Sequence, residues 1–280
     1  MLKLEPNTTR GTFLVATILC LACSVLVSSI AVGLRGMQER NKQQKLQRNV
    51  LKAAGLWDDD AGNEQIAEKF EQVETVLVNL PARDEDTAES ELINGTLDAA
   101  SYNARKAATQ PEMSVTIPPE FDLGGIKRRE KVAPAYLVKD EAGNLSKLVL
   151  PVNGKGLWST LYGFIAIDAD LTTIRGITFY DHAETPGLGG EINNEAGQGQ
   201  WDGKLAFDEN GEPAVDVVKG TVVPGNPNEK HQVDGLSGAT ITSNGVENLA
   251  NYWLGPDAFG PFLEHVREGE LRLTSAYSRE

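Results

Sequence analysis

The sequence has few of the residues that build disulfides or metal centres, with two cysteines and three histidines among 280 residues. Cys20 and Cys23 lie close together, whereas His182, His231 and His265 are scattered along the chain. Two cysteines exclude a disulfide framework and a metal site made of four thiolates from this chain. The scattered histidines leave little for a histidine-rich metal centre, so we predict no metal site.

Basic residues are also in deficit. The 26 Lys and Arg residues stand against 40 Asp and Glu residues, which gives a formal net charge of −14. A protein that binds nucleic acid needs a basic face to neutralise phosphates. We therefore exclude nucleic acid as a partner. The length suffices for one large domain or two small ones with a sizeable core.

One stretch, from Gly11 to Leu34, contains no charged residue and is bracketed by Arg10 and Arg35. At about 1.5 Å per residue, a helix of this length crosses the hydrocarbon core of a bilayer. A cleaved signal peptide is the alternative, but the stretch exceeds the roughly 7–15 apolar residues of a signal sequence. We predict one retained transmembrane helix, embedded in the lipid bilayer through residues 11–34.

Charges on either side of this stretch predict its orientation. Lys3 and Arg10 precede it, and a larger basic set follows it: Arg35, Arg40, Lys42, Lys45, Arg48 and Lys52. By the positive-inside rule, the chain after the span would stay in the cytoplasm.

Residues 35–130 have the character of a helical or linker region. Apolar spacing between residues 37 and 56 predicts a helix that continues out of the span and ends at Gly55. Residues 63–80 have the pattern of a second amphipathic helix, which Pro81 stops. Acidic residues from 84 to 91 predict a solvated surface. We expect this region to pack on the main domain.

The character changes at Val132, and the following residues predict strands and then helices. Apolar and β-branched runs separated by turn residues predict strands at 132–138, 145–152, 160–168, 173–180 and 214–219. Asn244 and Glu247 form a capping-box pattern at the start of a helix over 244–253, and a last helix surrounds Phe262. The predicted class is α+β: one N-terminal transmembrane helix, then an antiparallel sheet flanked by helices. The predicted units are an N-terminal tail (1–10), the span (11–34), the linker region (35–130), the main domain (131–270) and a C-terminal tail (271–280).

Segment 234–243, Asp-Gly-Leu-Ser-Gly-Ala-Thr-Ile-Thr-Ser, is rich in hydroxyls and small residues just before a predicted helix. Free backbone N–H groups and the helix dipole favour a phosphate at such a place. Gly238 and Ala239 leave room for a bulky group to approach Thr240, while Thr242 and Ser243 are predicted to cap the helix. A polar turn that only supplies helix caps is the alternative interpretation.

Two further segments are poor in bulky side chains. Residues 182–190 contain three glycines and a proline, which would allow a flat ligand to lie against backbone, and His182 with Glu184 could form a proton-transfer pair. In segment 154–160, Lys155 could meet a phosphate, and Trp158 could cover a ring or belong to the core. The sequence shows no Walker-A spacing, nucleophile elbow or zinc motif. We therefore assign no catalytic residue.

The three segments together resemble those of a known protein family. Asp234-x-x-Ser237-Gly238-Ala239-Thr240 resembles the flavinylation motif of the FMN-binding domain family. Together with segments 154–164 and 184–189, it is similar to the C subunits of bacterial Na+-translocating NADH:quinone reductases. The resemblance runs from the membrane helix to about Gly255. The G subunit of Rnf-type complexes shares the flavin motif, but segment 157–159 and the chain length suit the C subunits better.

The resemblance implies that FMN is linked through its phosphate to the Thr240 oxygen by a separate flavin transferase. It also implies an FMN-binding domain over 131–270. The implied flavin-site residues are Asp234, Ser237, Gly238, Ala239, Leu157, Trp158, Ser159, Glu184, Thr185, Gly187 and Leu188. The role of Asp234 stays open between recognition, metal binding and turn formation.

By the same resemblance, the chain carries electrons in a complex that oxidises NADH, reduces ubiquinone and exports Na+. Its partners would be other integral membrane subunits in the bacterial inner membrane, and NADH would bind elsewhere because no dinucleotide fingerprint is present. The resemblance places the flavin domain in the periplasm, against the local charge bias. The alternatives are a flavin-bearing membrane regulator or sensor, an Rnf-type G subunit, and a structural anchor.

Overall fold

The computed structural model describes residues 8–57, 62–80, 98–99 and 102–268. It divides the chain into two compact units, Met1–Lys45 and Leu46–Glu280.

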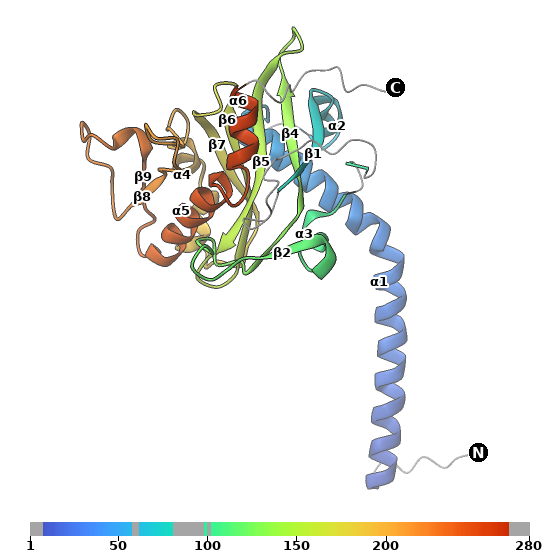
Figure 1. Ribbon diagram of the computed structural model, residues 1–280. Coiled ribbons are helices and arrows are strands. Elements are labelled where there is room, and N and C mark those ends of the chain that lie inside the picture. The colour runs from blue at the N-terminus through green and yellow to red at the C-terminus, as the bar shows by residue number, and fades with distance from the viewer. Residues whose placement is uncertain (1–7, 58–61, 81–97, 100–101, 269–280) are drawn as a thin grey trace. The chain divides into compact units, whose positions relative to one another are not determined.

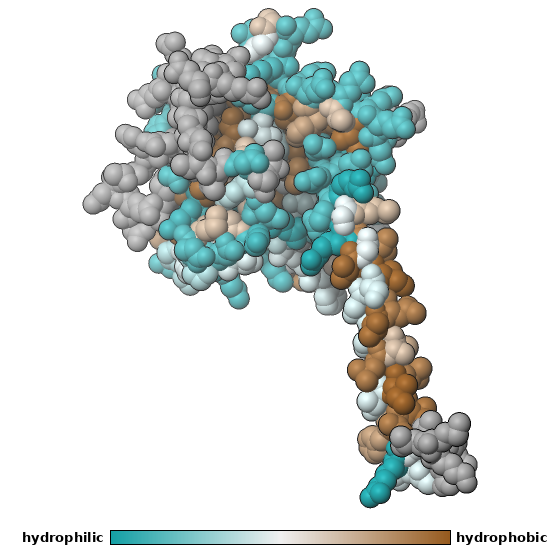
Figure 2. Space-filling model, turned by 90° about the vertical axis from the view of Figure 1, so that its right-hand side faces the viewer, coloured by the Kyte–Doolittle hydropathy of each residue, from teal (hydrophilic) through white to brown (hydrophobic). Residues whose placement is uncertain are grey.

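Helix α1 (Thr9–Ala53) contains the predicted span and its predicted continuation. The helix is long and hydrophobic enough to cross a membrane, and none of its 18-residue apolar window is buried inside the protein. Figure 2 shows apolar side chains along much of this exposed helix. The helix ends just before Gly55, whose φ of 69° lies in the left-handed region that favours glycine at a helix end. The predicted ending at Gly55 is confirmed.

The predicted helix over 63–80 is wrong in its second half. The helix α2 covers only Gln65–Phe70, and β1 follows it at Val73–Asn79. Three of the seven β1 residues are valine and one is threonine, and such β-branched side chains favour strands. β1 pairs antiparallel with the next long strand of the sheet, so tertiary pairing decides its conformation. The predicted acidic surface at 84–91 lies outside the described residues.

Four consecutive strands confirm the predicted antiparallel region: β4 (Val132–Lys139), β5 (Leu145–Lys155), β6 (Thr160–Asp168) and β7 (Ile174–Asp181). The sheet order is β1-β4-β5-β6-β7, with every neighbouring pair antiparallel (Figure 1). The turn predicted between β4 and β5 is held by Asp140, whose carboxylate accepts the N–H groups of Ala142 and Asn144.

The sheet has an apolar core on each face because successive strand residues point to opposite sides. In β5, Leu148 and Leu150 join one cluster with α5 (Thr240–Leu254) and α6 (Gly260–Glu268). Val149 joins the opposite cluster, which includes Leu51 from the end of α1. Figure 1 shows α5 and α6 together beside β5 to β7. The predicted final helix is therefore confirmed and covers the sheet.

The remaining described elements are short. They are α3 (Ala104–Ala107), η1 (Pro111–Met113), β2 (Ser114–Thr116), β3 (Arg128–Glu130), η2 (Gly189–Asn193), α4 (Glu195–Gly199), β8 (Asp216–Val218), η3 (Glu229–His231) and β9 (Gln232–Asp234). β2 and β3 pair antiparallel, and β8 and β9 pair parallel. β8 lies inside the strand predicted at 214–219.

The start predicted for α5 is wrong by four residues. The helix begins at Thr240 rather than Asn244, and Asn244 is an exposed residue within it. The proposed capping partner, Glu247, instead accepts the backbone N–H of Val217 in β8 at 2.9 Å. The last four residues of the hydroxyl-rich segment, 240–243, therefore form the first turn of the helix, and the rest of the segment precedes it.

Candidate functional site

The three segments singled out in the sequence meet at the start of α5. Glu184, which follows β7, links two of them directly to the helix. Its carboxylate accepts the backbone N–H groups of Leu157, Trp158 and Ser159 at 3.3, 2.9 and 3.2 Å. It also accepts the Thr242 hydroxyl at 2.8 Å. The turn after β5, the loop after β7 and the first turn of α5 therefore share one carboxylate.

The Glu184 side chain is buried, at 5% exposure, yet it is well satisfied. Burial acts to raise the pKa of Glu184, but the hydrogen bonds from Thr242 and from the three backbone N–H groups outweigh it. The pKa of this carboxyl therefore lies below its ordinary value. The group is ionised at neutral pH, and its charge is directed into the protein.

Two glycines leave room for this carboxylate. A β-carbon at Gly156 would lie 2.6 Å from Glu184 Oε1, and one at Gly189 would lie 2.8 Å from Oε2 and 2.6 Å from Thr242 Oγ1. Real β-carbons do not approach oxygens this closely, so any larger residue would displace the carboxylate. Gly156 and Gly189 thus serve close packing around the carboxylate, a role that the sequence did not predict.

The three hydroxyls at the start of α5 have different surroundings. Thr240 is exposed at the first helical position. Thr242 has 0% exposure and donates to Glu184. Ser243 is also buried, and its oxygen accepts the N–H of Leu236 at 2.9 Å. The predicted capping role of Thr242 and Ser243 is wrong: they hold neighbouring segments instead, because the helix starts before them.

The rest of the motif lies beside Thr240. Ser237 and Gly238 are exposed, and Ala239 is the buried residue that precedes the helix. Gly238 has a φ of 72°, which favours glycine, and a β-carbon there would lie 3.2 Å from Leu188 Cδ2. The motif and the 182–190 loop are therefore in contact.

Asp234 is hydrogen-bonded to other segments. Its carboxylate accepts the N–H of Val222 at 2.7 Å, and its own N–H donates to Gln200 Oε1 at 2.9 Å. Among the described residues, no group of three or more His, Cys, Asp or Glu side chains could hold a metal ion. Asp234 therefore organises the loop before the motif.

Apolar side chains are exposed in the same segments. Trp158 is 67% exposed, which excludes the interpretation of this residue as core. The other large exposed apolar residues of these segments are Leu157, Leu188 and Ile241. Ser159 is half-buried and its hydroxyl accepts the N–H of Ala183 at 2.7 Å, while Thr185 and Gly187 are exposed. The segments that meet here thus present an exposed hydroxyl at a helix N-terminus and an exposed tryptophan and leucines, which fits a phosphorylated ligand with a flat ring.

His182 and Glu184 do not form the proton-transfer pair considered from the sequence. His182 Nδ1 accepts the backbone N–H of Glu184 at 3.2 Å, and Asn193 Nδ2 lies 2.7 Å from His182 Nε2. These contacts orient the loop. Sequence reasoning missed Thr242, Gly156 and Gly189 as partners of Glu184, since only the fold brings them together.

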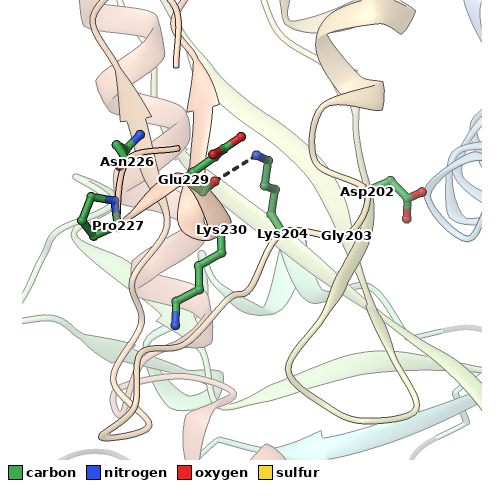
Figure 3. A pocket seen from close by; sticks show the side chains of 7 residues that line it. All are labelled: Asp202, Gly203, Lys204, Asn226, Pro227, Glu229 and Lys230. Carbon is green, nitrogen blue, oxygen red and sulfur yellow. Dashed lines mark hydrogen bonds between the residues drawn. The ribbon is translucent and has the colours of Figure 1, made fainter. Parts of the chain in front are cut away.

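A surface pocket of about 430 Å³ lies elsewhere (Figure 3). It is lined by Asp202, Gly203, Lys204, Asn226, Pro227, Glu229 and Lys230, none of which is a predicted site residue. Lys204 Nζ donates to the carbonyl oxygen of Glu229 at 3.0 Å across it. The candidate site is thus separate from this pocket.

Comparisons with known proteins agree on one family. A family model described as the FMN-binding domain matches residues 156–255, which include segments 182–190 and 234–243 whole and all of segment 154–160 except its first two residues. The C subunit of the Na(+)-translocating NADH-quinone reductase of Yersinia pestis is 45% identical over 93% of this chain and 94% of its own. The protein of the same name from Pseudomonas aeruginosa is 42% identical over 95% of this chain and 98% of its own.

Solved structures give the same result. The crystal structure of NqrC from Shewanella oneidensis matches with a TM-score of 0.72 and 36% identity, over 82% of this chain and 99% of its own. The C subunit of the Na(+)-translocating NADH-quinone reductase from Parabacteroides distasonis matches with a TM-score of 0.61 and 29% identity, over 82% and 96% of the two chains. The predicted α+β class with an antiparallel sheet is therefore confirmed.

Proposed function

Since this chain belongs to the family of Na(+)-translocating NADH-quinone reductase C subunits, we propose that it carries FMN as a phosphoester on Thr240 and relays electrons within such a complex. One observation supports Thr240 as the attachment site. Of the three hydroxyls at the start of α5, Thr240 alone is exposed, whereas Thr242 and Ser243 are buried and hydrogen-bonded. A separate enzyme that transfers a flavin nucleotide can reach the exposed Thr240 oxygen, whereas the buried oxygens of Thr242 and Ser243 are inaccessible to it.

The first turn of α5 suits the phosphate of the cofactor. The first N–H groups of a helix have no partner within the helix, and its dipole favours negative charge there. Ser237, Gly238 and Ala239 form the approach to Thr240. A flavin transferase would act on FAD: Thr240 Oγ bonds to the flavin-side phosphorus, the pyrophosphate bond breaks, AMP leaves and the hydroxyl proton passes to solvent.

The exposed apolar side chains suit the ring of the cofactor. Trp158 and Leu157 on the turn after β5, and Leu188 on the loop after β7, would border it. FMN, when bound, takes up and releases electrons singly or in pairs, so the chemistry belongs to the cofactor. The chain supplies attachment, position and surroundings. His182 and Glu184 are committed to internal hydrogen bonds, which suits a relay rather than acid–base catalysis.

Family membership supports a proposal for the complex and its location. The relatives are named as subunits of a reductase that uses NADH and quinone and moves Na+. We assign this chain to a complex of the bacterial inner membrane that oxidises NADH, reduces ubiquinone and exports Na+, with other integral membrane subunits as partners. Residues 11–34 anchor it in the bilayer, and the flavin domain faces the periplasm, where the transferase acts. Family membership favours a C subunit of this reductase over an Rnf-type G subunit.

Thr240 substitutions test this proposal. The full chain, co-expressed with a flavin transferase, is denatured and examined for flavin fluorescence in a gel. Thr240→Val keeps the size and branching of the side chain but removes the oxygen, so the fluorescent band should disappear. Thr240→Ser retains a hydroxyl and should stay fluorescent. Thr242→Val is the matched control and should keep the band. Fluorescence retained by Thr240→Val but lost in Thr242→Val would move the attachment to Thr242.

A further inference from the structure

We propose that Glu184 is a positioning residue that sets the turn 156–159 and the first turn of α5 in register, so that Trp158 and Thr240 face the same flavin. This inference rests on the proposed function, because it names what holds that site together. Glu184 itself would not touch the flavin. It acts through the backbone N–H groups of the turn and through the Thr242 hydroxyl.

Three successive N–H groups converge on this carboxylate. Such a row of backbone N–H groups forms a concave anion site. If the carboxylate acceptor were removed, these partly buried N–H groups would have no hydrogen-bond partner, which would destabilise the turn. The turn has few other ties: Gly156 donates to the carbonyl oxygen of Ser159 at 2.8 Å, and the Ser159 hydroxyl accepts from Ala183. The position of the exposed Trp158 ring therefore depends on Glu184.

The helix side of the link is Thr242, which lies on the opposite side of the first turn from Thr240. Thr242 is fully buried, and its hydroxyl reaches Glu184 at 2.8 Å. This hydrogen bond fixes the rotation of the first helical turn relative to the loop after β7. The attachment oxygen of Thr240 is fixed by the same rotation, because both residues belong to one rigid turn.

The surroundings of the Glu184 side chain suit a carboxylate. Both of its oxygens receive donors, and Gly156 and Gly189 border it closely. Glutamine has the same shape as glutamate, but it replaces one carboxylate oxygen with an NH₂ group, which cannot accept a hydrogen bond from the turn N–H groups or from the Thr242 hydroxyl. Glu184→Gln therefore keeps the volume and breaks part of the link. Asparagine or alanine would also leave a void, so glutamine is the cleaner probe.

Hydrogen exchange measured on the full chain in detergent tests the link itself. In Glu184→Gln, amides 157–159 should exchange at least about tenfold faster than in the wild type, since a hydrogen bond to a charged acceptor is lost. Glu247→Gln is the matched control. Its carboxylate also accepts a backbone N–H, that of Val217, but it does not touch the turn. It should leave amides 157–159 unchanged.

Flavin spectroscopy tests the positioning role, which a purely structural role would not affect. With equal covalent flavin content, Glu184→Gln should change the visible circular dichroism and the midpoint potential of the flavin, and Glu247→Gln should change neither. If Glu184→Gln does not fold, Thr242→Val serves in its place, and Thr242→Ser should restore both readouts.

Two results would overturn the inference: unchanged exchange at 157–159 in a folded variant, or faster exchange with an unaltered flavin spectrum and potential. A wild-type chain that acquires no flavin would refute the proposed function, and with it the positioning role. Exchange at 157–159 would still report whether Glu184 holds the turn, so the two failures are distinguishable.

Discussion

Thr240 and Thr242 are two residues apart, yet the helix turns them to opposite surroundings. Each residue of an α-helix advances by about 100°, so two residues separate the side chains by about 200°. Thr240 is exposed, and Thr242 is buried against Glu184. The chemistry assigned to each hydroxyl follows from this geometry: the outer one is accessible to an enzyme, and the inner one holds a carboxylate.

Glu130, at the end of β3, provides a pH prediction at the residue scale. Burial raises its pKa to about 7, against the lowering effects of its own backbone N–H and of Arg129. The unfolded chain has an ordinary Glu pKa near 4.5, so the unfolded state ionises first as pH rises. The free energy of unfolding should therefore fall by about 2 kcal/mol between pH 5 and pH 8 through this group.

Urea titrations of the full chain in detergent at several pH values measure this effect. Glu130→Gln should remove the fall, and Glu112→Gln, a change at an exposed carboxyl, should leave it in place. Parallel pH dependences for the wild type and Glu130→Gln would show that Glu130 is ionised in the folded protein.

At the residue scale, the sequence predicts which residues gather but not what they contact. The motif ending at Thr240 predicts this residue as the attachment site only through its resemblance to the flavinylation motif. The Glu184–Thr242 hydrogen bond joins residues 58 apart, and no local pattern indicates such a pair. The sequence also leaves Trp158 open between core and ligand surface, because exposure is decided by tertiary packing.

At the scale of elements, the close fit between α5 and the end of β5 positions the site. Gly245 faces the backbone of Lys155, and a β-carbon there would collide with the Lys155 carbonyl oxygen. A backbone oxygen cannot rotate away, so the helix or the strand must move. Small residues at this contact let the helix lie close to the sheet.

Gly245→Ala should therefore destabilise the domain by about 1–3 kcal/mol, as overpacking does in other cores. Urea unfolding followed by tryptophan fluorescence measures it, since Trp253 in the same helix is fully buried. Asn244→Ala, at the exposed neighbouring position, is the control and should change stability little. A Gly245→Ala variant as stable as the wild type would mean that α5 shifts freely on β5.

Elements could be predicted where the pattern is strong and local. The strands β5 and β6 lie where their apolar runs predict them. Both faces of these strands are buried by different partners, so apolar residues follow one another in the middle of each strand. The prediction at β1 was wrong because its residues fit a helical period as well as a strand, and pairing with β4 decides between them. The start of α5 was misplaced because Asn244 and Glu247 resemble a helix start that the structure does not use.

At the scale of the whole molecule, the chain combines an apolar helix with a folded domain, and their arrangement across the membrane is a prediction. Basic residues after the span predict a cytoplasmic domain, whereas the resemblance noted in the sequence predicts a periplasmic one. Large domains translocate despite nearby charge, and partner subunits also influence orientation. The predicted domain boundaries at 34 and 130 also remain predictions.

A fusion experiment measures the orientation. Alkaline phosphatase joined after Glu280 folds only in the periplasm, so the fusion should be active in intact cells. A reporter that works only in the cytoplasm, joined at the same residue, should be inactive. The reverse pattern would place the flavin domain in the cytoplasm and would require the transferase to act there.

Covalent FMN on Thr240 is the central claim, and mass spectrometry tests it most directly. The full chain is co-expressed with a flavin transferase, its intact mass is measured, and its peptides are sequenced. We predict a mass increase of one FMN less one water, carried by the peptide that contains Thr240 and located on that residue. An unmodified intact mass, or FMN located on another residue, would contradict this claim.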